Sequence, residues 1–234
     1  MALHKKVERL MSLKPDLAII PECAEPDVIR AKSPDFAFTD CEWTGEQSNK
    51  GLGVFSFGSL TLRRHQSWDR SHHIFIPIEV RGAVALNLLA VWAFNHRVPA
   101  TVSPNPKTTA AAIEHYQKFL AAAPGCVAGD FNANAHWDAV GRYAKFSTVD
   151  GLLQGAGLRS AFHAKHDVEL GRETDHPTHF FQRNAERGFH IDYAYVPAAW
   201  VPDLNSVTIG TAEEWIGVSD HAPLIVDVTL PGTN

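Results

Sequence analysis

The chain has 234 residues, of which 45% are hydrophobic and 20% are charged, and its formal net charge is -5. This length and composition predict one globular domain over residues 1–234 and exclude a largely disordered chain. The acidic balance argues against a tight, sequence-independent grip on long nucleic acid, because such a grip needs clustered lysine and arginine.

The amino-terminal part of the chain predicts a helix, a strand and a second helix. Apolar residues recur at helical spacing over residues 3–11, and Pro15 ends the pattern. Residues 17–21 predict a short buried strand with Glu22 at its end. Pro26 then opens a second helix, since proline is tolerated in a first turn.

Between residues 36 and 95 the sequence predicts strands separated by turns. The expected strands cover residues 36–38, 53–57, 74–80 and 83–94, and the expected turns cover residues 45–51, 58–59 and 81–82. Short strands with such turns favour antiparallel hairpins.

The rest of the chain mixes helices with strands. The expected helices cover residues 108–123 and 146–153, and the expected strands cover residues 126–128, 190–196, 207–209 and 223–229. Helices flank runs of strands and do not alternate strictly with them. We therefore expect an α+β fold, a four-layer α/β/β/α sandwich of two mainly antiparallel sheets with flanking helices.

Several expected strand ends carry acidic side chains beside other polar groups. These positions are Glu22, Asp130 with Asn132, Asp192, and Asp220 with His221. Carboxylates gathered at one rim repel each other unless a hard cation neutralises them, and oxygen-rich sites suit Mg²⁺ or Mn²⁺. Convergence of these ends would therefore indicate a metal site, although each segment alone also fits an ordinary turn.

Four segments resemble motifs of the endonuclease/exonuclease/phosphatase superfamily, the metal-dependent phosphoesterases that include deoxyribonuclease and apurinic-site endonucleases. Residues 15–22 resemble its PDIIxLQE segment, residues 129–132 match GDFN, residues 190–193 resemble IDY, and residues 219–223 match SDHxP. The four lie in the family's order and cover nearly the whole chain. The resemblance implies a sandwich fold and hydrolysis of a phosphate ester.

The resemblance also implies which residues would hold the metal and the attacking water. Glu22 would bind Mg²⁺ or Mn²⁺, and Asp220 would contribute to the metal region. Asp130 would orient or deprotonate the water. Asn132 would hold that water or a phosphate oxygen.

Other implied positions concern the phosphate group. His221 would lie against it, with Asp192 fixing the imidazole ring and raising its basicity. Relatives place a ring near the phosphate where this chain has Trp92, and His96 is a substitute donor slightly further on. His179 is a further candidate contact of the metal or the substrate.

The chain departs from the family pattern at its start. Relatives begin with a strand that ends in an asparagine, whereas Met1 already stands at the helix that should follow. We therefore expect either a start assigned too late or a missing central strand. A missing strand would expose a sheet edge that a second copy covers, which would permit a dimer.

The sequence favours a metal-dependent phosphoesterase with nuclease-like phosphodiester hydrolysis. The alternatives are a phosphomonoesterase or lipid-headgroup phosphodiesterase of the same family, or a non-catalytic relative that binds a phosphate ligand. The expected partner is a phosphate-ester substrate, with nucleic acid as one candidate. The chain has no signal-peptide pattern, no membrane-length apolar stretch and no paired cysteine spacing, so we expect a cytoplasmic protein without a membrane partner.

Overall fold

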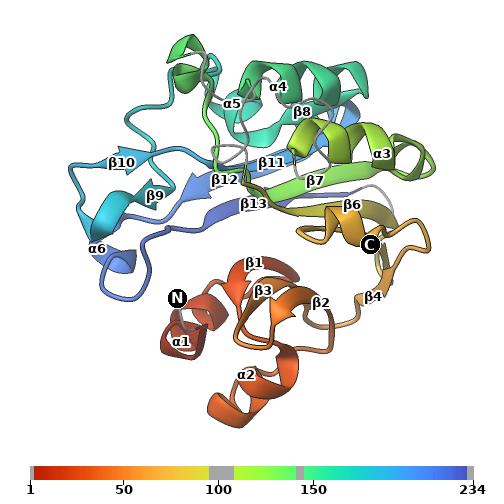
Figure 1. Ribbon diagram of the computed structural model, residues 1–234, viewed down its shortest axis with the longest axis vertical. Helices are drawn as coiled ribbons and strands as arrows, with labels where there is room; N and C mark the ends of the chain where they lie inside the picture. Colours follow the sequence, from red (N-terminus) through yellow and green to blue (C-terminus); the bar gives the residue numbers. More distant parts are fainter. Residues whose placement is uncertain (1–2, 95–107, 141–144, 231–234) are drawn as a thin grey trace.

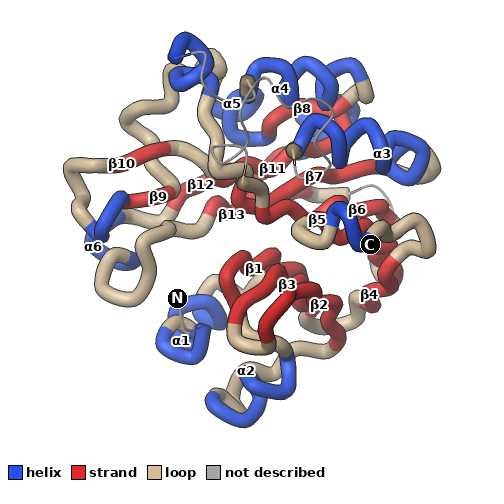
Figure 2. Tube along the Cα trace, viewed as in Figure 1, coloured by secondary structure: helices blue, strands red, loops and turns tan. Residues whose placement is uncertain are grey.

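A computed structural model of the protein describes residues 3–94, 108–140 and 145–230, and these residues form four layers (Figure 1). A six-stranded sheet has the order β4 (Thr61–Arg64), β5 (Phe75–Arg81), β6 (Leu86–Trp92), β7 (Gly125–Asp130), β11 (Asp192–Pro197) and β8 (Leu158–Ser160). A three-stranded sheet has the order β1 (Leu17–Cys23), β3 (Lys50–Ser56) and β2 (Asp40–Gln47). Figure 2 shows these two groups of strands lying one above the other.

Helices cover the outer faces of the two sheets (Figure 1). The larger sheet carries α3 (Thr109–Ala121), α4 (Phe146–Gly155) and α5 (Ala161–His166), and the smaller sheet carries α1 (Val7–Ser12) and α2 (Pro26–Lys32). Every pairing in the two sheets is antiparallel except that of β6 with β7. The predicted α+β sandwich of mainly antiparallel sheets is therefore confirmed.

Two short hairpins complete the described elements. They are β9 (His179–Phe180) with β10 (Gly188–Phe189), and β12 (Leu204–Ile209) with β13 (Leu224–Val228), and the short helix α6 (Ala212–Trp215) lies between the strands of the second hairpin in sequence. Within the described residues, β1 pairs only with β3 and β13 pairs only with β12. Both strands line one cleft of about 1060 Å³.

Strand β3 shows why the layers hold together. Leu52 and Val54 belong to the main core, which includes the larger sheet, whereas Phe55 belongs to a second core that includes Leu3 and Ile29. Successive side chains of a strand point to opposite faces, so a strand between two layers must be apolar on both sides. Burial of both faces of β3 joins the smaller sheet to its helices and to the larger sheet.

Helix α3 begins and ends where the sequence predicts. The Oγ1 of Thr108 accepts a hydrogen bond from the N–H of Ala111 at 3.3 Å, which satisfies one of the free donors of the first turn. The buried face carries Ile113, Tyr116 and Phe119. This helix packs against β5, β6 and β7 of the larger sheet.

The expected elements near the amino-terminal sheet are partly wrong. Residues 36–38 form no strand, because Phe36 and Phe38 pack their rings against Phe55 at 5.2 and 5.1 Å without backbone pairing. The predicted turn over residues 45–51 is confirmed only at residues 48–49, because the residues on either side of them are the paired ends of β2 and β3. A Cβ at Gly45 or Gly51 would overlap the ring of Trp43, so a close approach explains these glycines and a turn does not.

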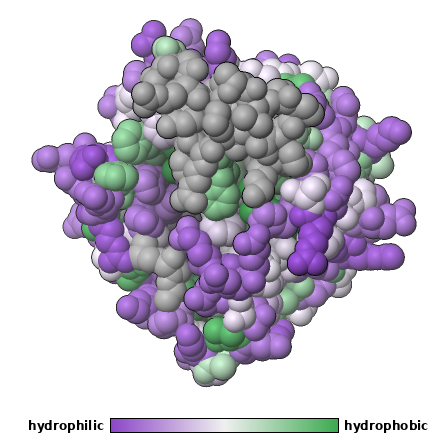
Figure 3. Space-filling model, in the orientation of Figure 1, coloured by the Kyte–Doolittle hydropathy of each residue, from purple (hydrophilic) through white to green (hydrophobic). Residues whose placement is uncertain are grey.

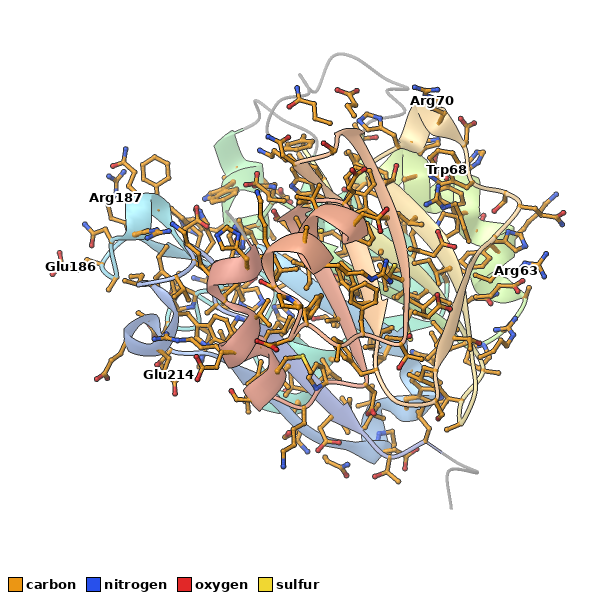
Figure 4. The ribbon with its side chains drawn as sticks, turned by 90° about the horizontal axis from the view of Figure 1, so that it is seen from below. Arg63, Trp68, Arg70, Glu186, Arg187 and Glu214 are labelled. Carbon is orange, nitrogen blue, oxygen red and sulfur yellow. The ribbon has the colours of Figure 1, made fainter. Side chains whose placement is uncertain are left out.

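The surface is polar over most of the view in Figure 3. The exposed large hydrophobic residues among those described are Phe181 and Phe189, both at the hairpin of β9 and β10. Figure 4 shows Glu186 and Arg187 of this hairpin at the outer edge of the molecule. None of the described helices is long and apolar enough to cross a membrane.

Candidate active site

Two acidic side chains meet at one edge of the larger sheet. Asp130 ends β7 and Asp192 begins β11, and the two are directly paired in the antiparallel register. Asp130 is only 3% exposed. The sheet topology therefore brings together two carboxylates that lie far apart in the sequence.

Gly129 is needed for this arrangement. Its φ is +138°, a conformation that residues with a side chain rarely adopt. A Cβ at this position would overlap the carbonyl oxygen of Val91 on the neighbouring strand β6. The glycine thus lets β7 lie close to β6 immediately before Asp130.

Asn132 holds the carboxylate of Asp130 in place. Its backbone N–H donates to Asp130 Oδ1 at 2.8 Å, and its Nδ2 donates to Asp130 Oδ2 at 2.8 Å and to the carbonyl of Ala93 at 3.0 Å. Asn132 has a φ of +46°, which asparagine tolerates better than most residues. Its amide nitrogen therefore binds the protein, and the predicted contact with water or phosphate would have to use its Oδ1.

His221 is oriented from two sides. Its Nδ1 lies 2.9 Å from Asp192 Oδ2, and its backbone N–H donates to Ser219 Oγ at 3.1 Å. A single β-bridge joins it to His179, whose ring centre lies 4.6 Å away. The carboxylate–imidazole pair leaves Nε2 as the ring nitrogen that is free of Asp192.

Thr178 positions Asp192, a role that the sequence did not reveal. Its Oγ1 accepts hydrogen bonds from the backbone N–H groups of Ile191 and Asp192, both at 3.0 Å, and the residue is fully buried. The neighbouring His179 was the predicted candidate contact in this segment. A threonine that binds two distant backbone groups has no sequence signal of its own.

The acidic side chains and the imidazole of the site shift one another's pKa values. Burial raises the pKa of Asp130, and the nearby charge of Asp192 raises it further. Burial alone would lower the pKa of His221, but the charge of Asp192 and its hydrogen bond outweigh burial and raise that pKa to about 9. The imidazole is therefore the cation of this pair at neutral pH.

These side chains fit a divalent cation. One ligand atom from each of Asp130, Asp192 and His221 lies within 4.8 Å of the others. Two adjacent carboxylates, one of them buried, repel each other until a cation neutralises them. The two carboxylates are thus suited to a hard metal ion, and the protonated imidazole of His221 lies beside them as a hydrogen-bond donor.

Glu22 and Asp220, the predicted metal ligands, line the same cleft as this cluster. Neither belongs to the gathered set of ligand atoms in the described part of the chain. Glu22 has a φ of +56°, and its Oε1 lies 2.8 Å from Lys50 Nζ. Burial opposes ionisation of Glu22, but the hydrogen bond and the charge of Lys50 lower its pKa.

The three predicted substrate contacts differ in their surroundings. Trp92 is 7% exposed and packs against Phe94 at 4.9 Å, with Lys50 Nζ 5.4 Å from its ring centre. His179 lines the cleft beside His221, and burial lowers its pKa, as does the charge of His221. His96 lies outside the described residues.

Lys6 was not among the predicted site residues, yet it lines the same cleft. Its Nζ donates a hydrogen bond to Ser219 Oγ at 3.4 Å. Burial lowers the pKa of Lys6, and the negative charge of Asp220 opposes this effect. A lysine in a loop-to-helix junction has no sequence signal for such a position.

The fold is shared with solved structures of nucleases and phosphatases. An AP endonuclease from Archaeoglobus fulgidus has a TM-score of 0.72 and 12% identity over 97% of this chain and 94% of its own. A 3′ phosphatase from Neisseria bound to a product DNA hairpin has a TM-score of 0.71 and 18% identity over 98% and 96%. A 3′-5′ exonuclease from Neisseria meningitidis has a TM-score of 0.69 and 18% identity over 98% and 96%.

At these identities the likeness concerns the fold. No protein-family model matches the chain, and no curated protein matches it in sequence. The similar structures are described as an exonuclease, a phosphatase and endonucleases, so the fold that the four motifs imply is confirmed.

Proposed function

We propose that this protein is a divalent-metal-dependent phosphoesterase that hydrolyses phosphodiester bonds of a nucleic acid. The cluster of Asp130, Asp192 and His221 is the observation that supports this proposal most strongly. It lies in a large cleft of a fold shared with nucleases and a 3′ phosphatase. Each residue of the cluster belongs to one of the motifs on which the resemblance was based.

The carboxylates of the cleft are suited to Mg²⁺ or Mn²⁺. Asp130 and Asp192 occupy paired positions of β7 and β11, and Glu22 and Asp220 are further candidate ligands in the same cleft. Such a cation supplies positive charge that stabilises the negative charge developing on the phosphate oxygens.

Asp130 and His221 have complementary roles in this proposal. Asp130, whose carboxylate Asn132 holds in the cleft, would take a proton from the attacking water. His221 would donate a hydrogen bond from Nε2 to a phosphate oxygen, because its Nδ1 is bound to Asp192. Asp192 would keep the ring protonated and correctly oriented.

Aromatic side chains beside the catalytic imidazole favour a nucleic-acid substrate. The ring of His179 lies 6.4 Å from that of Phe189, and Phe189 lies 5.3 Å from Trp137. Phe189 is one of the few exposed large apolar residues of the described chain. Aromatic rings stack on nucleobases with little sequence preference. With a net charge of -5, the protein suits a short or single-stranded segment better than long duplex DNA.

A phosphomonoester at the end of a DNA strand is the second candidate substrate. One similar structure is a 3′ phosphatase bound to a product DNA hairpin. The same cluster would serve this reaction, because the attacking water and the phosphate group are unchanged. The two reactions differ in the part of the substrate that the rest of the cleft has to accommodate.

Hydrolysis of bis(p-nitrophenyl) phosphate and of two labelled oligonucleotides, one ending in a 3′-phosphate, tests the proposal. We expect turnover that depends on added Mg²⁺ or Mn²⁺ and collapses in Asp130→Ala and His221→Ala. The exposed Asp203→Ala and His4→Ala variants are matched controls and should retain activity. Absence of metal-dependent turnover on all three substrates would reject the proposal. Phosphate binding without turnover would indicate a non-catalytic relative.

A further inference from the structure

Lys6 places a positive charge inside the cleft that holds the acidic cluster. It precedes α1, and its side chain lines the cleft together with Asp130, Asp192 and His221. Its Nζ donates to Ser219 Oγ at 3.4 Å, and the same oxygen accepts the backbone N–H of His221. Ser219 is 2% exposed, so the ammonium group is anchored to a rigid part of the site.

Lys6 differs in its partners from Lys50, which is paired with the cleft residue Glu22. Lys50 lies 2.8 Å from a carboxylate oxygen of Glu22 and is bound to it. No ion pair formed between described residues includes Lys6. Asp220, Glu22 and Asp192 act on Lys6 through their charges, but the one hydrogen-bond partner of its ammonium group in the described chain is a neutral hydroxyl.

Lys6 is partly exposed, and the part of its ammonium group that loses hydration is costly without a bound anion, because a neutral hydroxyl replaces that hydration only in part. Once a divalent cation neutralises the carboxylates of the cluster, their attraction for Lys6 falls. A phosphate group then becomes the anion that can compensate Lys6. Lysine is a common phosphate ligand, in which the ammonium acts as a compact charge with three donors.

We propose that Lys6 binds the substrate by donating a hydrogen bond from its ammonium group to a non-bridging oxygen of the phosphate group. This inference rests on the proposed function in one respect, namely that the ligand of the cleft is a phosphate ester. The bond from Lys6 would go to an oxygen that stays on the phosphorus throughout the reaction, and Lys6 would take no proton. Its contribution is therefore to affinity and orientation.

The test compares Lys6→Met with Lys5→Met. Methionine is similar in length to lysine and packs well in irregular spaces, and Lys5 is the exposed neighbour on the same segment. Calorimetric titration of each folded variant with inorganic phosphate in the presence of Mg²⁺ measures binding without any turnover. We expect Lys6→Met to raise the phosphate Kd about tenfold, the usual effect of a lost hydrogen bond between charged groups, and Lys5→Met to leave it unchanged.

Steady-state kinetics and two further variants separate a phosphate contact from a purely structural role. With bis(p-nitrophenyl) phosphate, Lys6→Met should raise KM by a similar factor with little loss of kcat, because the contact is made before and during the reaction. Lys6→Arg should retain most of the phosphate affinity that Lys6→Met loses. If the methionine variant fails to fold, Lys6→Gln replaces it.

Each outcome supports or overturns the assignment of Lys6. An unchanged phosphate Kd in Lys6→Met and Lys6→Gln, an equal loss in Lys5→Met, or no binding of phosphate to the wild type would overturn it. Tighter Mg²⁺ binding with an unchanged phosphate Kd would make Lys6 a counter-ion of the carboxylates, and also overturns it. Lys6-dependent phosphate binding without hydrolysis would keep the assignment and reject the proposed function.

Discussion

The carboxylates of Asp130 and Asp192 occupy directly paired positions of strands β7 and β11. Each residue is bound by a different part of the chain. Asn132 donates a hydrogen bond to the carboxylate of Asp130, and His221 is bound to the carboxylate of Asp192. The backbone N–H of Asp192 donates to Thr178. Hydrogen bonds to side chains and backbone therefore hold both residues in place.

Asp192→Asn should lower kcat/KM about 100-fold or more, within the usual contribution of a positioned proton donor or acceptor. The asparagine keeps the size of the side chain but removes the charge that raises the pKa of His221 to about 9. An NMR pH titration of His221 should show its pKa lowered relative to the wild type. Normal kinetics together with a lowered pKa would show that the charge of His221 is not needed.

Removal of divalent metal should abolish hydrolysis and lower stability. A ligand that binds only the folded state stabilises it by about 2.7 kcal/mol at a concentration 100 times its Kd. We therefore expect Mg²⁺ to raise the melting temperature of the wild type and of Asp203→Ala, whose carboxylate is exposed. Asp130→Ala should lose this increase, and an undiminished increase would place the metal elsewhere.

Gly129→Ala should destabilise the protein by about 1–3 kcal/mol from backbone strain alone, because φ at this position is +138°. The overlap of the new Cβ with the carbonyl of Val91 adds to this cost and displaces Asp130. Gly151→Ala is the matched control, since Gly151 lies within α4 with open space where the new methyl group would stand, and should gain up to about 1 kcal/mol. Urea denaturation measures both, and equal stabilities would contradict the prediction.

Glu173→Ala should cost about 3–5 kcal/mol, as removal of one partner from a buried charged network does. Glu173 is 1% exposed, and its Oε1 accepts hydrogen bonds from Asn134 Nδ2 and the hydroxyl of Tyr193, both at 3.2 Å, and lies 3.5 Å from His163 Nε2. Chemical denaturation should show this loss. The exposed Glu169→Ala should stay within about 0.5 kcal/mol of the wild type.

His190 should make the fold less stable in mild acid. Burial lowers its pKa in the folded state below the ordinary value of 6.5, although the hydrogen bond to the His176 carbonyl opposes this effect. The unfolded chain therefore takes up a proton below pH 6.5 that the folded chain resists, so the contribution to stability is complete above pH 6.5 and is lost as the pH falls. The slope of unfolding free energy against pH between neutrality and mild acid should be shallower in His190→Gln than in wild type or in the exposed His4→Gln control. Equal slopes would exclude this role.

Local sequence patterns were sufficient to predict the helices and strands whose buried residues recur at a regular spacing. Helix α3 has an apolar face and a capping threonine, and β5 and β6 are continuous apolar runs, so each was predicted close to its observed bounds. Around β2 the glycines predicted a longer turn than the one observed at residues 48–49. Gly45 of β2 and Gly51 of β3 serve a close approach to the ring of Trp43, which no local pattern predicts.

The sequence by itself determined the sandwich class and the four motif segments, because periodicity, turn residues and short motifs are local properties of the chain. Only the tertiary structure decided that Asp130 and Asp192 are paired, that Thr178 binds the backbone of Asp192, and that Lys6 reaches the same cleft. These relationships join segments far apart in the chain. They depend on strand register and on packing between layers, which no single segment contains.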